Sequence, residues 1–216
     1  MENRDLIEKV RQFKDEYYSK NHKNFFLKKK QKMLMAKQIS NMFSLEELIR
    51  KTAFNIEGTN KIYLDYTVFK LYANETNYDV IVTYIMKIYI DCVEKYSGYE
   101  VHVNLDSLTP SAAERYKKCI ELFNQATGHC SISNKLLQWY IYYPPSMIGM
   151  IRNILRYVID PNIIDKFTVV PREHSASALK TLIETSSIPL FIHADREYDY
   201  ESEEEEIKDE REDSST

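Results

Sequence analysis

The run Leu136-Leu-Gln-Trp-Tyr-Ile-Tyr-Tyr143 is nearly continuous in apolar and aromatic residues, and Pro144-Pro145 follows it directly. Such a run predicts a strand that is buried on both faces of a sheet. The next segment, 146–159, is very apolar and predicts a helix that Asp160-Pro161 stops. An apolar strand followed at once by an apolar helix indicates an α/β arrangement.

Strand and helix patterns alternate on both sides of this pair. Residues that favour β-structure recur in three further segments, 62–68, 99–105 and 167–170, which predict strands. Capped or amphipathic segments predict helices that end near Gly98 and Gly128, and a last helix around 177–185. The alternation predicts an α/β fold whose mixed, largely parallel sheet is flanked by helices.

The two ends of the chain carry opposite charge. Residues 1–40 hold eleven Lys and Arg against five Asp and Glu, whereas residues 195–216 hold three against twelve. The whole chain has a formal net charge of −4, so its centre is nearly neutral. This pattern predicts a helical, basic N-terminal extension over 1–55, a folded domain over 56–194, and an acidic, disordered tail over 195–216.

Residues 136–192 resemble the CRAL-TRIO (Sec14-like) family, most closely the compact branch that includes the BCH scaffolds. In that family a central strand ends in a proline before an apolar helix, as at Pro144 or Pro145 here, and a lysine precedes the next strand, as at Lys166. The segment Leu179–Pro189 resembles the leucine-rich helix that follows. The chain departs from the family at Arg156-Tyr157, where the family has a phenylalanine, and it lacks a Gly-Gly pair after Pro189.

The resemblance implies a non-enzymatic module that binds a lipid or other small apolar ligand in a slot under a gate-like helix, 146–159. Two alternatives stay open. The helix packs shut on the sheet and the chain is a BCH-type protein-interaction scaffold, or the chain is a viral structural or virion-associated protein, since compact domains of this kind occur in large DNA viruses. The residues predicted to line the slot are Met147, Ile148, Ile151, Ile154, Leu155 and Val158.

A basic segment lies within the N-terminal extension. Lys28, Lys29 and Lys30 could meet anionic lipid headgroups, with Phe25 and Phe26 entering the interface beside them. This predicts a peripheral membrane contact. A solvated helix face and a nuclear-localisation patch fit the same residues. The acidic tail is either a solubilising segment or an electrostatic latch that folds back on the basic N-terminus.

Catalytic and metal-binding patterns are missing from the sequence. The five histidines lack metal-ligand spacing, and no serine or cysteine has a motif that supplies a base. Asp106 follows a predicted strand, the place where α/β sheets bind ligands, but a lone aspartate there is typical of a turn. We therefore predict no enzyme activity, no cofactor and no metal.

The remaining composition bears on partners and location. The near-neutral centre and the negative total charge argue against a nucleic-acid partner. Three cysteines, Cys92, Cys119 and Cys130, are an odd number and predict no disulfide framework. No apolar run approaches the roughly 18 residues of a membrane span. The sequence thus predicts a cytoplasmic protein, in the host cytoplasm or the virion if it is viral.

Overall fold

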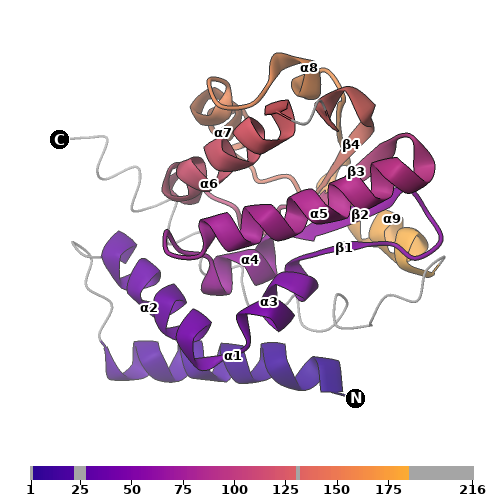
Figure 1. Cartoon of the computed structure of the whole chain (residues 1–216). Helices are drawn as coiled ribbons and strands as arrows, with labels where there is room; N and C mark the ends of the chain where they lie inside the picture. The colour runs from indigo at the N-terminus through magenta and orange to yellow at the C-terminus, as the bar shows by residue number, and fades with distance from the viewer. Residues whose placement is uncertain (1, 22–27, 130–131, 185–216) are drawn as a thin grey trace.

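The computed structural model describes residues 2–21, 28–129 and 132–184 (Figure 1). Its centre is a five-stranded sheet in the order β1-β2-β3-β4-β5. β1 (Ala53–Asn55) pairs antiparallel with β2 (Lys61–Asp65), and β3 (Tyr99–Asn104), β4 (Leu136–Tyr142) and β5 (Phe167–Val169) continue the sheet in parallel. The predicted α/β class, with a mixed and largely parallel sheet, is confirmed. The resemblance to CRAL-TRIO domains stays a prediction.

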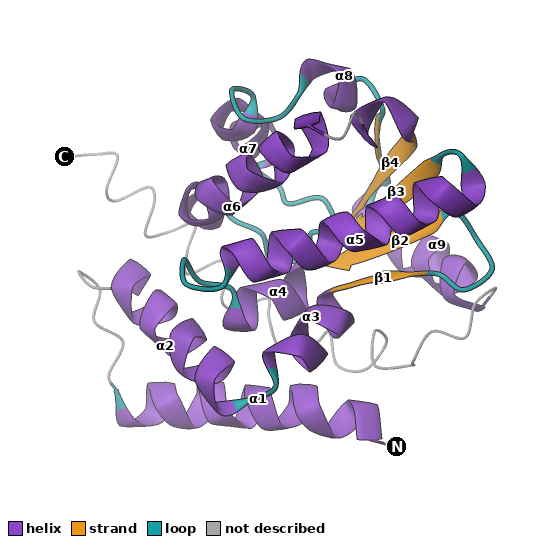
Figure 2. Cartoon of the chain, in the orientation of Figure 1, coloured by secondary structure: helices purple, strands orange, loops and turns teal. Residues whose placement is uncertain are grey.

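Helices precede, connect and follow the strands (Figure 2). Before the sheet come α1 (Glu2–Lys20), α2 (Lys28–Met42) and α3 (Leu45–Thr52). Between strands lie α4 (Tyr66–Tyr72), α5 (Tyr78–Tyr96), α6 (Pro110–His129), a short 3-10 helix (Ile132–Lys135), α7 (Ile148–Leu155) and α8 (Pro161–Ile164), and α9 (Arg172–Glu184) follows β5. Among the described residues, no helix combines the length and apolarity that crossing a membrane requires.

The sheet has helices on both faces. Two neighbouring residues of β2 show which helices cover each face. Ile62 belongs to the main core cluster, with residues of α5, α6 and α7. The next residue, Tyr63, belongs to a second cluster with Leu179 and Leu182 of α9. Successive side chains of a strand point to opposite faces. Accordingly α5, α6 and α7 cover one face and α9 covers part of the other (Figure 1).

The N-terminal helices share the main core. Val10 of α1 and Ile39 of α2 are fully buried in it, as is Leu48 of α3. The boundary predicted between residues 55 and 56 falls between β1 and the strand with which it pairs. α1, α2, α3 and β1 therefore pack as part of the α/β body. The predicted tail lies outside the described residues.

The predicted strand over 62–68 is wrong in its second half. The strand ends at Asp65, whose carboxylate accepts a hydrogen bond from the amide of Thr67 at 2.8 Å and caps α4. Tyr66 and Val68, which continue the alternation in the sequence, are buried members of α4 instead. The strand therefore ends at the capping aspartate, although the pattern of β-forming residues continues beyond it.

The predicted helix over 146–159 and the strand before it also need correction. The helix is shorter, from Ile148 to Leu155, and the Asp160-Pro161 pair that was read as a stop begins α8, with Asp160 as its cap. β4 is not buried on both faces, because Leu137 is 54% exposed. The strand after it, β5, has three residues and leaves part of β4 open to solvent.

Two buried tyrosines give a matched test of how hydroxyl groups contribute to stability. The hydroxyl of Tyr72 lies 2.8 Å from the hydroxyl of Thr52, whereas the buried hydroxyl of Tyr89 has no hydrogen-bond partner within the described structure. A buried unsatisfied hydroxyl costs about 1–3 kcal/mol, and a satisfied one contributes about 1 kcal/mol. We expect Tyr89→Phe to raise the free energy of unfolding by about 1 kcal/mol and Tyr72→Phe to lower it by a similar amount.

Urea unfolding of both variants beside the parent chain checks this prediction. Both substitutions leave the aromatic ring with its neighbours: Tyr89 lies edge-on to Tyr99 at 4.8 Å between ring centroids, and Tyr72 lies edge-on to Phe69 at 6.4 Å. Equal destabilisation by the two substitutions would contradict the difference in hydrogen bonding.

Candidate anion-binding hollow

Helix α2 divides its residues between the core and the surface. Its segment Lys28–Met42 contains no glycine or proline and is rich in lysine, methionine, glutamine and alanine, which favour helix. Met35, Ala36 and Ile39 are buried against the rest of the molecule. Lys29, Lys30 and Lys37 are exposed. The helix is therefore anchored through one face and presents its charges on another.

A loop between α4 and α5 stands opposite these lysines. Asn74, only 3% exposed, donates from its side-chain amide to the carbonyl of Tyr72 at 2.9 Å and to the hydroxyl of Ser40 in α2 at 3.2 Å. Its side-chain oxygen accepts from the amide and the hydroxyl of Thr76, at 3.1 Å and 2.6 Å. The side-chain oxygen of Asn77 fixes the other end of the loop by accepting a hydrogen bond from the backbone amide of Asn74 at 3.0 Å. These bonds fix the loop against α2.

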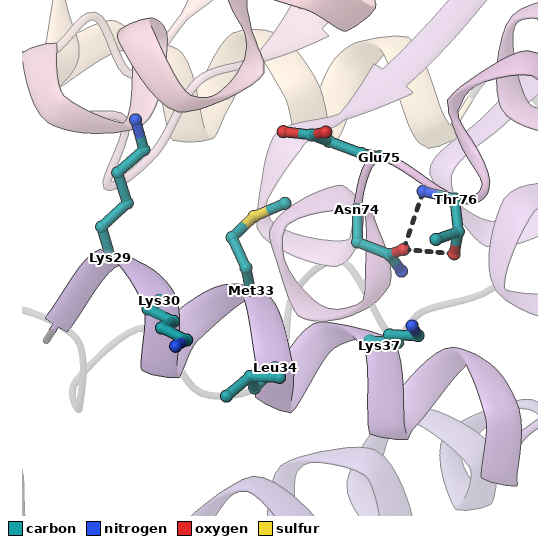
Figure 3. Close-up of a pocket in the computed structure, with 8 residues that line it drawn as sticks. All are labelled: Lys29, Lys30, Met33, Leu34, Lys37, Asn74, Glu75 and Thr76. Atoms are coloured by element: carbon teal, nitrogen blue, oxygen red, sulfur yellow. Dashed lines mark hydrogen bonds between the residues drawn. The ribbon is translucent and has the colours of Figure 1, made fainter.

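The space between α2 and this loop is a hollow of about 490 Å³ (Figure 3). Met33 projects into it from α2, and Lys29 and Lys37 lie on either side of Met33 along the helix. Glu75 faces the helix from the loop. A volume of this size falls within the range of small-ligand sites, roughly 300–1,000 Å³. The lining residues are Lys29, Lys30, Met33, Leu34, Lys37, Asn74, Glu75 and Thr76.

The hollow is positively charged with an apolar centre. Three lysines and one carboxylate, that of Glu75, line the hollow, in a chain whose total charge is negative. Each ammonium group carries three hydrogen-bond donors and no acceptor. Leu34, 47% exposed, and the half-buried Met33 lie between the charges. The arrangement can bind an anion that carries an apolar part, and we call it the basic hollow.

The predicted membrane-contact residues fall partly within this site. Lys29 and Lys30 line the basic hollow. Lys28 begins α2, but its side chain lies outside the described residues, as do Phe25 and Phe26. The structure thus brings two of the five predicted contact residues to one site and leaves the other three as predictions.

The six predicted slot residues do not line the basic hollow. Ile151 and Leu155 are 3% and 9% exposed and belong to the main core, while Ile154 and Val158 pack against it. Ile148 and Met147, the residue that precedes α7, are partly buried. The burial of Ile151 and Leu155 agrees with a packing role for these two residues, and ligand contact of the six remains a prediction.

The charged residues at the carboxyl edge of the sheet have hydrogen-bond partners within the chain. Asp106 lies in the turn between β3 and α6, and its carboxylate accepts from the guanidinium of Arg172 at 2.8 Å. The ammonium group of Lys70 donates to the hydroxyl of Ser107. Asp65 caps α4. This pairing agrees with the interpretation of Asp106 as a turn residue.

Both cysteines in the described part of the chain are buried, and their thiols are held protonated. Burial raises the pKa of the Cys119 thiol to about 12 and raises that of Cys92 as well. Thiols that stay protonated are poor nucleophiles and poor metal ligands. Within residues 2–21, 28–129 and 132–184, no group of three or more His, Cys, Asp or Glu is placed to hold a metal ion. Cys130 lies outside these residues.

Sequence reasoning missed Met33, Leu34, Lys37 and the loop 74–76 as parts of the site. One signal was present in the four consecutive apolar residues Met33-Leu-Met-Ala36. Because a helix turns about 100° per residue, these four cannot all face the core of the protein. Met35 and Ala36 are buried, which leaves the pair before them at the surface. No local rule brings residue 74 beside α2, because that contact depends on the packing of α4.

Comparisons with known proteins add no family to this description. No protein-family model matches the chain, and a search of the curated proteins gives no match.

Proposed function

We propose that the chain is a non-enzymatic module that binds anionic membrane surfaces through the basic hollow. The observation that carries this proposal is the hollow itself, in which three lysines surround an apolar centre built by Met33 and Leu34. An anionic lipid has the matching chemistry. Its phosphate can accept hydrogen bonds from the ammonium groups, and its glycerol and upper acyl carbons can lie on the apolar side chains.

The energetics of such a contact are modest for each charge and add up over the lysines and the apolar residues beside them. A lysine near an anionic bilayer contributes about 1 kcal/mol. Three lysines of the basic hollow, with Lys28 beside them in the sequence, give a binding free energy that depends strongly on salt. The apolar sequence Phe25-Phe26-Leu27 directly precedes α2 and would add burial of apolar surface at the same place.

A lipid-binding slot under α7 is the second part of this proposal. It rests on the resemblance to CRAL-TRIO domains. The exposed apolar side chains of Met150 and Tyr157, 47% and 76% exposed, would contact the membrane while the lipid enters the slot. A lipid drawn from the membrane would be buried there at about 0.8 kcal/mol for each methylene hidden from water.

Vesicle co-sedimentation tests the membrane contact. The full chain is expected to bind phosphatidylcholine vesicles that contain phosphatidylserine and to leave pure phosphatidylcholine vesicles unbound. Substituting Lys29, Lys30 and Lys37 by glutamine is expected to weaken binding at least tenfold, about 1.4 kcal/mol, since each charge contributes up to about 1 kcal/mol.

The matched control neutralises three exposed lysines on other helices, Lys87, Lys118 and Lys180. It changes the net charge equally. We expect it to weaken binding by less than about twofold, because salt screens the attraction between the membrane and charges that lie away from the contact. An equal loss in both triple variants would mean that net charge, and not the basic hollow, drives binding.

A protein-interaction scaffold is the second candidate function. The burial of Ile151 and Leu155 favours it, because a helix packed into the core resembles the closed arrangement expected of a BCH-type module. Under this alternative, the full chain would not bind anionic vesicles, and organic extraction of the purified protein would yield no lipid.

A further inference from the structure

The basic hollow has a candidate occupant within the same chain. Residues 195–216 carry twelve acidic and three basic residues, and the run Glu201-Ser-Glu-Glu-Glu-Glu-Ile207 places five carboxylates directly before an apolar side chain. The basic hollow offers the complementary groups, three ammonium donors around Met33 and Leu34. Charge and apolar surface thus match between the two ends of the sequence.

The connecting chain is long enough for this contact. From Glu184, the last residue of α9, to Ile207 there are 23 residues, which span up to about 75 Å when extended at roughly 3.3 Å each. A body of the size described has a radius of gyration of about 16 Å. A sphere with this radius of gyration has a radius of about 21 Å and half its circumference is about 65 Å, so the last residues of the run, Glu204 to Ile207, can reach any point on the surface.

We infer that the acidic run Glu201–Ile207 occupies the basic hollow and competes with anionic lipid for it. This inference rests on the proposed function, because it assigns a regulator to the same site. A tethered segment acts at an effective concentration in the millimolar range, so even a weak contact is substantially populated. Membrane binding by the full chain is therefore weaker than the hollow alone would give.

Zero-length cross-linking tests the contact without a membrane. A carbodiimide condenses a carboxylate with a lysine amine only when the two groups touch, and mass spectrometry of tryptic peptides then locates the amide. In the full chain at low salt, cross-links from the tail run are expected at Lys29, Lys30 and Lys37, at least tenfold above those at Lys87, Lys118 and Lys180. At about 0.5 M salt they are expected to disappear, because the Debye length falls to roughly 4 Å.

Vesicle binding tests the competition, with the total charge controlled. Glu203, Glu204, Glu205 and Glu206 are replaced by glutamine in one variant. The control replaces four exposed acids of the described surface, Asp91, Glu94, Glu114 and Asp165, by their amides. Both variants gain the same charge, so weaker repulsion from the vesicle affects them alike. Competition predicts that the tail variant binds at least threefold more tightly than the control variant.

The outcomes separate the two proposals. Equal vesicle binding by the two charge variants, or cross-links spread evenly over all six lysines, overturns the tail contact while the membrane function stands. Failure of the full chain and the tail variant alike to bind anionic vesicles overturns the proposed function. Cross-links confined to the hollow lysines would still establish the contact in that case.

Discussion

Ile151→Ala is expected to lower the free energy of unfolding by about 2–4 kcal/mol. Ile151 is 3% exposed and lies in the main core with residues of α5 and α6. Shortening a buried isoleucine to alanine removes apolar burial and leaves a cavity that the surroundings fill only in part. Urea unfolding measured by circular dichroism gives the change directly.

The neighbouring substitution Met150→Ala is the matched control. Met150 lies in the same helix but is 47% exposed, so its truncation is expected to change the free energy of unfolding by no more than about 0.5 kcal/mol. If Ile151→Ala were equally mild, α7 would not be packed onto the core, and the slot under this helix would gain support over the scaffold alternative. The two substitutions thus test whether α7 is packed on the core, and the test needs no knowledge of a ligand.

Stability is expected to fall by about 2–3 kcal/mol between pH 7.5 and pH 4.5 because of His102 alone. Its imidazole is 4% exposed, with Nδ1 lying 2.8 Å from the hydroxyl of Tyr142 and the ring stacked on Tyr140 at 4.8 Å. Burial, with a smaller effect of Lys61, lowers the pKa of His102 to about 4. The carboxylate of Glu100, 3.5 Å from Nε2, favours the charged ring, but burial dominates.

The sign follows from proton binding. The unfolded chain binds a proton at His102 below about pH 6.5, whereas the folded chain binds it only near pH 4. Between these values the unfolded state holds more protons, so the stability contribution is complete above pH 6.5 and is lost as the pH falls toward 4. The loss is on the order of 3 kcal/mol over the whole window.

Urea unfolding at the two pH values, on the parent chain and on His102→Gln, measures this contribution. The difference in free energy of unfolding between pH 7.5 and pH 4.5 should shrink by about 2–3 kcal/mol in the variant. His174→Gln, which removes an exposed imidazole of α9, controls for the loss of a histidine. An unchanged difference in His102→Gln would show that the buried ring takes up its proton without opposing folding.

Local signals predicted the elements in which sequence and packing agree. The helices predicted to end near Gly98 and Gly128 coincide with α5 and α6, whose inner faces lie in the main core. β3 was predicted to within one residue because its alternation matches its environment. In these segments propensity, capping and burial all favour the same structure.

Other elements depend on contacts that no local pattern contains. Tyr66-Thr-Val-Phe69 is rich in β-forming residues, yet burial of Tyr66 and Val68 and the cap at Asp65 make it helical. β1 has three residues and exists through its pairing with β2. The basic hollow itself was not predicted: only Lys29 and Lys30 of its lining were named, as membrane-contact residues, and its opposite wall comes from the distant loop residues Asn74, Glu75 and Thr76.

The sequential strand order has a consequence for how the chain is made. Each parallel strand lies beside the strand that precedes it along the chain, so a ribosome-bound chain can extend the sheet one strand at a time as it emerges. The second face is different, because Leu179 and Leu182 of α9 must return to Tyr63 near the start of the sheet. That face stays uncovered until synthesis has passed residue 184, which makes it the surface that a chaperone would meet on the nascent protein.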